Sequence, residues 1–268
     1  MSFMKSASTL SRLASEAIGE LNELRLALRS DPEEELIHRF RVLYKKIRAL
    51  YRMAGVVSVG KGFRLHKSWK QVYQSAGMVR DTQILLKLVI TQMGEGPLAG
   101  LLQQQLSHHQ GSFNAVLLQS DPGKEHYNKW KKTCNCDDYF SGRFAELHLY
   151  YRQPLYDEEL HAIRKQLKDI MYNQSWLLKA EIAGPAFLQQ IPIAETDALQ
   201  QLLGEYQDNV VQASIVRQLA VLPAVREDSE NLERWISQSF RKQVSLRATA
   251  EKSLENFFHL HAPGSLDQ

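Results

Sequence analysis

Apolar residues recur every three or four positions along most of this chain, which is the period of an amphipathic α-helix. Glycine and proline are sparse and fall mainly between the periodic stretches, while alternating, strand-like runs are nearly absent. We therefore expect an all-α protein in which short connections join long helices into antiparallel bundles. The helices are predicted over 4–29, 32–54, 62–93, 97–119, 138–152, 157–180, 195–222 and 229–259.

The second of these helices has the clearest start signals. Asp31 is placed as its N-cap, Pro32 at its first helical position and Glu34 for a capping box. The acidic residues of this turn also suit the positive end of the helix dipole. We therefore expect the helix to begin at residue 32.

A stripe of basic residues runs along the same helix. Its members are spaced by 3, 4, 3 and 4 residues and lie within about 80° of one another at ~3.6 residues per turn: His38, Arg41, Lys45, Arg48 and Arg52. Apolar side chains centre on the opposite face, with two tyrosines along one edge: Leu36, Phe40, Leu43, Ile47 and Leu50, then Tyr44 and Tyr51. A single basic run is more often a solvated face than a binding site. Here no acid interrupts the stripe, although like charges one turn apart are mildly destabilising, and we call these five positions the basic ridge.

The second half of the sequence repeats the pattern of the ridge. In both halves an acidic turn precedes a His-x-x-Arg-x-x-x-Lys motif: His38, Arg41 and Lys45, then His161, Arg164 and Lys168. Further along, a glycine and an aspartate recur four residues apart: Gly77 and Asp81, then Gly204 and Asp208. The separation from the histidine to the aspartate is 43 residues in one half and 47 in the other. Such a repeat favours the interpretation of the basic stripe as a binding site over that of a solvated helix face.

The simplest explanation of this repeat is an internally duplicated helical bundle. We predict a single domain over 1–268, made of the halves 1–130 and 138–268, which join within 120–140. If a pseudo-two-fold axis relates the halves, their two basic stripes can face each other across a central groove or pore. Facing rows of Arg and Lys repel one another unless an anion lies between them, and both side chains bind phosphate oxygens well. The pattern therefore predicts an extended polyanionic ligand whose binding weakens as salt rises.

Two interpretations of the repeated aspartates are open. Asp81 and Asp208 could belong to a metal-binding or general-base pair, or they could support the cationic side chains by ion pairing. We favour the ion-pair interpretation, because a carboxylate near a row of cations is normally a partner of one of them.

Composition adds little specific chemistry. The formal charge is +3, so affinity for an anion has to come from local clustering. The chain has two cysteines, Cys134 and Cys136. A zinc site would need further ligands, and the nearest histidine, His126, is a poor candidate. We therefore expect no metal and no cofactor, and we expect the protein to lie in the reducing cytoplasm with its cysteines as free thiols. The first residues lack a secretory signal, and the most apolar run is short and broken by Lys87, so no membrane span is expected.

Four motifs in this order resemble the CHAD family, the conserved histidine α-helical domain: "IHRFRVLYKKIRALYR", "GMVRD", "LHAIRKQLKDIMY" and "LLGEYQD". The resemblance covers nearly the whole chain. It implies two four-helix halves in a pseudo-two-fold arrangement around a basic central cavity, inorganic polyphosphate as ligand, and association with polyphosphate granules. Family members are often fused to a triphosphate-hydrolysing CYTH domain, and none is visible in this sequence. The resemblance therefore implies a stand-alone polyphosphate-binding protein.

The same resemblance assigns the binding residues. Matching the family motifs position by position gives His38, Arg41, Lys45, Arg48, Arg52, Arg80, His161, Arg164 and Lys168, with Lys46 and Lys165 beside them. Three positions depart from the family pattern, because Met171 and Gln207 replace bases and Asp169 follows the lysine of the second motif. We therefore expect the second half to make fewer phosphate contacts.

Three functions remain under consideration at this stage. The first is non-catalytic polyphosphate binding, since no nucleophile, Gly-rich phosphate loop or cluster of metal-binding acids is evident. The second is a metal-dependent phosphohydrolase that uses His38, His161 and the motif aspartates, although a His among cations is a poor metal ligand. The third, nucleic-acid binding, is disfavoured because the tyrosines of the ridge helix lie toward its buried edge. Other basic residues with open roles are Lys70, Arg241, Arg247 and the "KWKK" run at 129–132.

Overall fold

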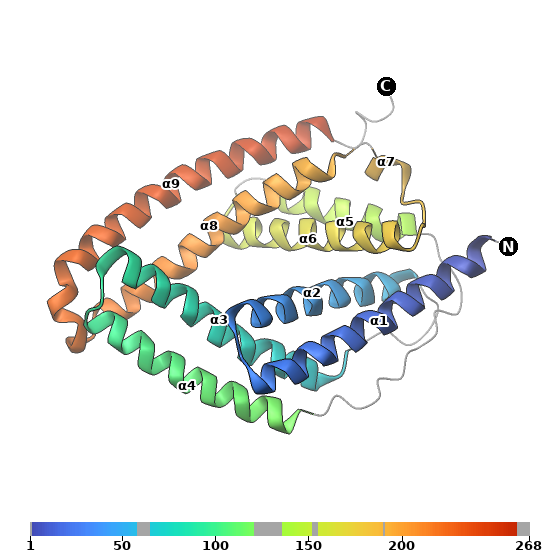
Figure 1. Ribbon diagram of the computed structural model, residues 1–268. Coiled ribbons are helices and arrows are strands. Elements are labelled where there is room, and N and C mark those ends of the chain that lie inside the picture. Colours follow the sequence, from blue (N-terminus) through green and yellow to red (C-terminus); the bar gives the residue numbers. More distant parts are fainter. Residues whose placement is uncertain (1, 58–64, 121–135, 152–154, 190, 262–268) are drawn as a thin grey trace. The chain divides into compact units, whose positions relative to one another are not determined.

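Helices joined by short connections make up the part of the chain that the computed structural model describes, which comprises residues 2–57, 65–120, 136–151, 155–189 and 191–261. Its α-helices are α1 (Ser2–Ser30), α2 (Glu34–Val57), α3 (Lys67–Met93), α4 (Pro97–Gln119), α5 (Cys136–Tyr151), α6 (Asp157–Lys179), α7 (Ala186–Gln189), α8 (Ile193–Ala220) and α9 (Ser229–Leu260) (Figure 1). A 3₁₀ helix, η1 (Pro223–Asp228), lies between α8 and α9. The predicted all-α class is confirmed.

The predicted helices coincide with α1 to α6, α8 and α9, and their ends differ by a few residues. The largest shift among the described residues is at α3, which begins at Lys67 because His66 caps it: the Nδ1 atom of His66 accepts a hydrogen bond from Ser68 N at 3.4 Å. The sequence did not predict α7 or η1, since one or two turns are too short to establish a period.

The predicted start of α2 is wrong by two residues. Asp31 N donates to Ala27 O at 3.0 Å, so Asp31 closes the end of α1 instead of capping α2. The first bond into α2 runs from Ile37 N to Glu33 O, also at 3.0 Å, which leaves Pro32 in the connection. A proline disfavours the helical conformation in the residue before it, and this explains why it separates the two helices here.

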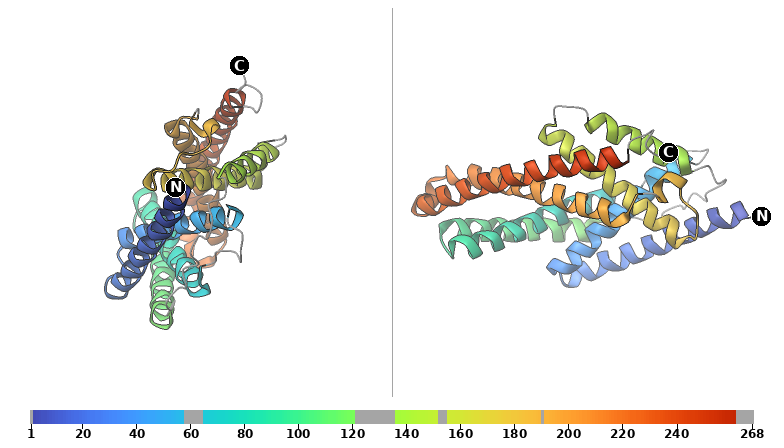
Figure 2. Two further views of the ribbon diagram at one scale, coloured as in Figure 1. Left: turned by 90° about the vertical axis from the view of Figure 1, so that its right-hand side faces the viewer. Right: turned by 90° about the horizontal axis from the view of Figure 1, so that it is seen from above.

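The described helices group into two compact units. Unit 1 comprises Met1–Thr133 and Leu219–Leu232, and unit 2 comprises Cys134–Gln218 and Glu233–Gln268. In unit 1, α3 packs along α4, α1 along α2, and α2 against α3, and both views of Figure 2 show α3 beside α4. The internal duplication and the groove expected between the halves stay predictions.

One hydrogen bond explains why the segment after α8 packs with unit 1. Asp228, at the end of η1, accepts a hydrogen bond from Leu98 N through its Oδ2 atom at 2.8 Å. This carboxylate caps the first turn of α4, which has Gly96 as its N-cap residue and no side-chain cap of its own. A Cβ on Gly96 would approach Asp228 Oδ1 to 2.6 Å, so the glycine makes room for the cap.

The core of unit 1 lies under the apolar face of α2. Phe40, Ile47 and Leu50 are fully buried, as predicted, and the Phe40 ring lies 6.3 Å from that of Trp69 on α3. Leu36 and Leu43, predicted at the centre of this face, are half-buried. The buried face is instead completed by two neighbouring positions, Ile37 and Tyr44.

The core of unit 2 joins α6 to α8 and α9. Its largest fully buried side chains include Tyr206 of α8, Phe140 of α5 and Phe257 of α9. At the start of α6, Asp157 accepts hydrogen bonds from the Tyr206 hydroxyl at 2.6 Å and from Arg247 Nη1 at 3.1 Å. These bonds fix the first turn of α6 against α8 and α9.

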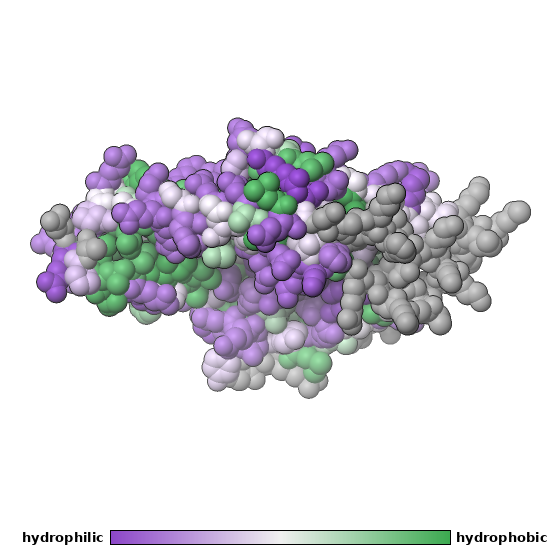
Figure 3. Space-filling view, turned by 90° about the horizontal axis from the view of Figure 1, so that it is seen from below, coloured by the Kyte–Doolittle hydropathy of each residue, from purple (hydrophilic) through white to green (hydrophobic). Residues whose placement is uncertain are grey.

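One face of the molecule shows how polar and apolar residues are distributed. On the face drawn in Figure 3, hydrophilic residues predominate and apolar residues form smaller patches between them. Among the described residues, no helix combines the length and apolar character that a bilayer crossing requires.

Candidate anion-binding site

The basic ridge runs along α2 on the side away from its buried face. His38 and Arg48 are exposed, whereas Arg41, Lys45 and Arg52 are half-buried. The half-buried members cover part of their length with protein, and for Arg41 the covered part includes the guanidinium. The ridge therefore has the burial pattern that the sequence predicted for one face of an amphipathic helix.

Arg41 is held against α3. Its Nη1 atom donates to Tyr73 O at 3.3 Å, and the guanidinium lies over the Tyr73 ring at 4.8 Å from the ring centroid. Its Nη2 atom is 3.9 Å from Asp81 Oδ1, an ion-pair distance, and the supporting role of this aspartate stays a prediction. A Cβ on Gly77 would overlap Arg41 Nη1 and come within 3.1 Å of its Cζ atom, so this close approach requires glycine.

Arg80 forms an ion pair with a side chain of its own unit. Its guanidinium donates to Glu34, in the first turn of α2. This hydrogen bond is the main cause that lowers the pKa of Glu34. Arg80 was assigned to phosphate binding through the family motif, and its place at this ion pair also links α3 to α2.

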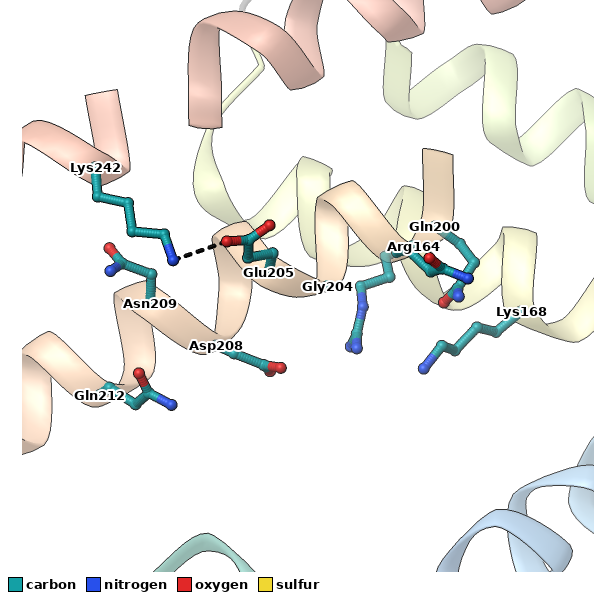
Figure 4. Close-up of a pocket in the computed structure, with 10 residues that line it drawn as sticks. Arg164, Lys168, Gln200, Gly204, Glu205, Asp208, Asn209, Gln212 and Lys242 are labelled. Atoms are coloured by element: carbon teal, nitrogen blue, oxygen red, sulfur yellow. Dashed lines mark ion pairs between the residues drawn. The ribbon is translucent and has the colours of Figure 1, made fainter. Parts of the chain in front are cut away.

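Unit 2 contains a second arginine that lies on a glycine. Arg164 of α6 crosses α8 at Gly204, where a Cβ would be 3.0 Å from Nη2 and 3.1 Å from Nε of the guanidinium. The motif residues of both halves thus form the same pairing, in which an arginine from the His-x-x-Arg helix lies on a glycine of a partner helix. Within unit 2 this pairing brings Arg164 and Lys168 to the same side of α8 (Figure 4).

These residues line a cavity of about 420 Å³ formed by α6, α8 and α9. Figure 4 shows the ends of Arg164 and Lys168 directed toward one another beneath Gly204, and the Asp208 carboxylate directed to the same space. Lys242 of α9 pairs with Glu205 at 2.7 Å on the other side of α8. The complete lining is Arg164, Lys168, Gln200, Gln201, Gly204, Glu205, Asp208, Asn209, Gln212 and Lys242.

Burial in and beside this cavity disfavours positive charge. Burial, followed by the nearby Arg164, lowers the pKa of Lys168, while Asp208 and Asp197 act in the opposite direction. Burial is also the largest cause of the lowered pKa of His161, with Lys165 and Arg164 adding to it. Among the described residues, the Nε atom of Arg164 is buried without a hydrogen-bond partner, as is the Nδ1 atom of His161, which is not part of the cavity lining. Such groups are stabilised by an acceptor that carries negative charge.

The other basic residues named from the sequence have different surroundings. Lys165, Lys70 and Arg241 are exposed and Lys46 is half-buried. Arg247 acts as a structural clamp, since it donates to Leu155 O, Asp157 and Glu251. Cys134, His126 and the 129–132 run lie outside the described residues. Among the described residues, no group of three or more His, Cys, Asp or Glu side chains is arranged to hold a metal ion.

The sequence did not identify the polar lining that α8 contributes. Gln200, Gly204, Asp208 and Gln212 follow one another at intervals of four and so form a single stripe along the helix. Extending the Gly-to-Asp spacing by one turn in each direction would have found both glutamines. Asn209 and Lys242 gave no such signal, because tertiary packing brings them to the cavity.

Comparison with known proteins places this chain in a family. The model of the CHAD domain matches residues 12–217. The crystal structure of the CHAD domain from the plant Ricinus communis matches with a TM-score of 0.59 and 14% identity, covering 97% of this chain and 92% of that one. At this identity the structural likeness shows a shared fold. The search of curated proteins found no match to the chain. Since the family model spans most of the sequence, the chain belongs to the CHAD domain family.

Proposed function

We propose that this protein binds inorganic polyphosphate without altering it chemically. The observation that carries the proposal is the cavity of unit 2, where Arg164 and Lys168 converge and the buried Arg164 Nε lacks an acceptor. A phosphate oxygen supplies such an acceptor together with negative charge. Membership of the CHAD domain family supports the same ligand through the resemblance described above.

The basic ridge of α2 favours a long ligand over a single phosphate. Successive turns of the helix present cations at ~5.4 Å intervals, and an extended chain of phosphates can meet several of them at once. Each neutralised phosphate releases condensed counterions, so by analogy with nucleic acids the binding constant falls steeply with salt. A single orthophosphate would show neither high affinity nor a steep dependence on salt.

A titration with charge-reversed variants tests the proposal. We expect the wild type to bind long-chain polyphosphate in low salt, with affinity that falls as salt rises. Lys45→Glu combined with Arg48→Glu should lower the affinity at fixed salt by an order of magnitude or more. The matched control is Arg39→Glu combined with Lys252→Glu, which changes the net charge equally at exposed positions off the ridge. If both double variants lost the same affinity for polyphosphate, the loss would come from the change in net charge and not from the basic ridge.

Two further measurements separate the proposal from its alternatives. Incubation of the pure protein with polyphosphate and Mg²⁺ or Mn²⁺ should leave the chain length unchanged, and shortening would instead identify a phosphohydrolase. In a competition between single-stranded RNA and polyphosphate, we expect the protein to prefer polyphosphate. Tyr44 stacks on Tyr73 with ring centroids 4.5 Å apart and is buried in the core, so its ring is not accessible for stacking with a nucleobase. In cells, a fluorescently tagged protein should co-localise with polyphosphate granules in the cytoplasm.

A further inference from the structure

The two motif arginines lie on their glycines in the same way, but they differ in what neutralises them. Arg41 has three contacts within unit 1: the hydrogen bond to Tyr73 O, the face of the Tyr73 ring, and Asp81 at 3.9 Å. Its side chain is 16% exposed, whereas that of Asp81 is 63% exposed. Arg41 is therefore largely enclosed by its own protein partners, with its charge compensated by a side chain on the solvent side.

Arg164 lacks each of these contacts. The residue four positions before Gly204 is Gln200, so no aromatic ring stands where Tyr73 stands in unit 1. Among the described residues, neither Arg164 nor Lys168 makes a hydrogen bond or an ion pair, and Arg164 Nε is buried without an acceptor. Two cations thus share a cavity in which the nearby Asp208 raises the pKa of Lys168 without forming an ion pair with it.

The composition of the cavity suits a short polyphosphate segment. Arg164 and Lys168 supply two cations with unused donors, and the side-chain amides of Gln200, Gln201 and Gln212 can each donate to phosphate oxygens. A volume of about 420 Å³ is within the range of small-ligand sites. The carboxylates of Asp208 and Glu205 oppose a large anion, and the Lys242 ion pair offsets one of them.

We infer that the cavity of unit 2 is the primary phosphate anchor of this protein, and that Arg41 is a positioning residue that holds α2 against α3. This inference rests on the proposed function and departs from the expectation, drawn from Met171, Gln207 and Asp169, that the second half makes fewer phosphate contacts. The decisive quantity is the number of unused donors on each guanidinium, which the sequence pattern does not reveal.

Matched alanine substitutions of the two glycines test the inference, with inorganic tripolyphosphate as the probe. In Gly204→Ala the new methyl group would lie 3.0 Å from Arg164 Nη2 and shift the guanidinium by a few tenths of an ångström. This shift should misalign its hydrogen bond to phosphate, so we expect the affinity for tripolyphosphate to fall by up to about tenfold, the loss of one charge-assisted hydrogen bond. Alanine is the better helix former, so the melting temperature should hold or rise. A merely structural role for Gly204 would lower the melting temperature and leave the affinity in place.

Gly77→Ala should behave in the opposite way. Its methyl group would overlap Arg41 Nη1 and push the guanidinium away from Tyr73, whose backbone oxygen and ring it contacts, so we expect a lower melting temperature. The affinity for tripolyphosphate should change by less than threefold. Arg41→Gln and Arg164→Gln provide a second pair, in which we expect at least a fivefold larger loss of affinity for Arg164→Gln.

The outcomes distinguish the anchor from the function that it serves. If wild type fails to bind long-chain polyphosphate at low salt, the proposed function is wrong. If wild type binds but the Arg41 variant loses as much affinity for tripolyphosphate as the Arg164 variant, the function stands and the anchor in unit 2 is refuted. Should Gly77→Ala prevent folding, the comparison of the two glutamine variants still decides between these outcomes.

Discussion

Replacement of Lys168 by methionine should make the protein more stable and a weaker ligand binder. Lys168 is half-buried on α6 and projects into the cavity beside Arg164, four residues earlier on the same helix. Methionine keeps a long, unbranched side chain and removes the charge. The substitution therefore tests the charge of Lys168 with little change in packing.

The expected gain in stability follows from the surroundings of Lys168. Like charges one turn apart on a helix destabilise it by about 0.2–0.5 kcal/mol, and burial adds to this, since burial is the first cause that lowers the pKa of Lys168. Asp208 and Asp197 offset part of the effect. We estimate a net gain of about 0.5 kcal/mol, or roughly 1–2 °C in melting temperature for a domain of this size.

The expected loss in binding is larger. A hydrogen bond between a charged donor and phosphate contributes about 1.5–3 kcal/mol, so the affinity for tripolyphosphate should fall about 10- to 150-fold. Calorimetric titration measures the affinity, and a thermal melt without ligand measures the stability. Lys252→Met, on the exposed side of α9, is the control and should change neither quantity appreciably. A lower melting temperature in Lys168→Met would refute the reasoning, because it would mean that the lysine is satisfied within the protein.

Three further outcomes follow from individual groups. Burial, Lys165 and Arg164 lower the pKa of His161 in the folded protein below the ordinary value of 6.5. The folded state is therefore most stable above pH 6.5, where the ring is neutral in both states, and it loses stability as pH falls from 6.5 through the lower folded pKa. Thermal melts from pH 8 to 5 should show this loss, and His161→Gln should reduce it. Polyphosphate should raise the same pKa, which an NMR titration of the ring detects. Asp228→Ala removes the cap on Leu98 N and should destabilise the protein by about 1–2 kcal/mol in urea unfolding, whereas Asp228→Asn should retain part of the cap.

The sequence predicted the helices well because each long helix buries one continuous face. Phe40, Ile47 and Leu50 recur at the helical period and are all fully buried. The errors occur where a single hydrogen bond decides between neighbouring residues. At the start of α2, the carbonyl of Ala27 competes for the N–H of Asp31, and propensity alone does not resolve that competition.

The sequence predicted which residue types form the candidate site, but it did not predict which neighbouring side chains neutralise each arginine. Spacing placed Arg41 and Arg164 at equivalent positions, and the structure gives both of them a glycine to lie on. Their difference depends on residues distant in sequence, namely Tyr73 and Asp81 in unit 1 and the open cavity in unit 2. A motif compares positions along the chain, whereas the number of unused donors depends on which neighbours fold against them.

The position of Asp208 explains how the cavity tolerates two neighbouring cations. A carboxylate bonded directly to Arg164 would occupy the donors that a phosphate needs, as Asp81 is placed to do for Arg41. Without forming an ion pair, Asp208 still raises the pKa of Lys168 and so reduces the repulsion, while the Nε atom of Arg164 has no acceptor among the described residues. A ligand then gains the full charge-assisted hydrogen bonds and meets one exposed carboxylate in return. A balance of this kind favours reversible binding, because the same aspartate that stabilises the empty cavity opposes the bound anion.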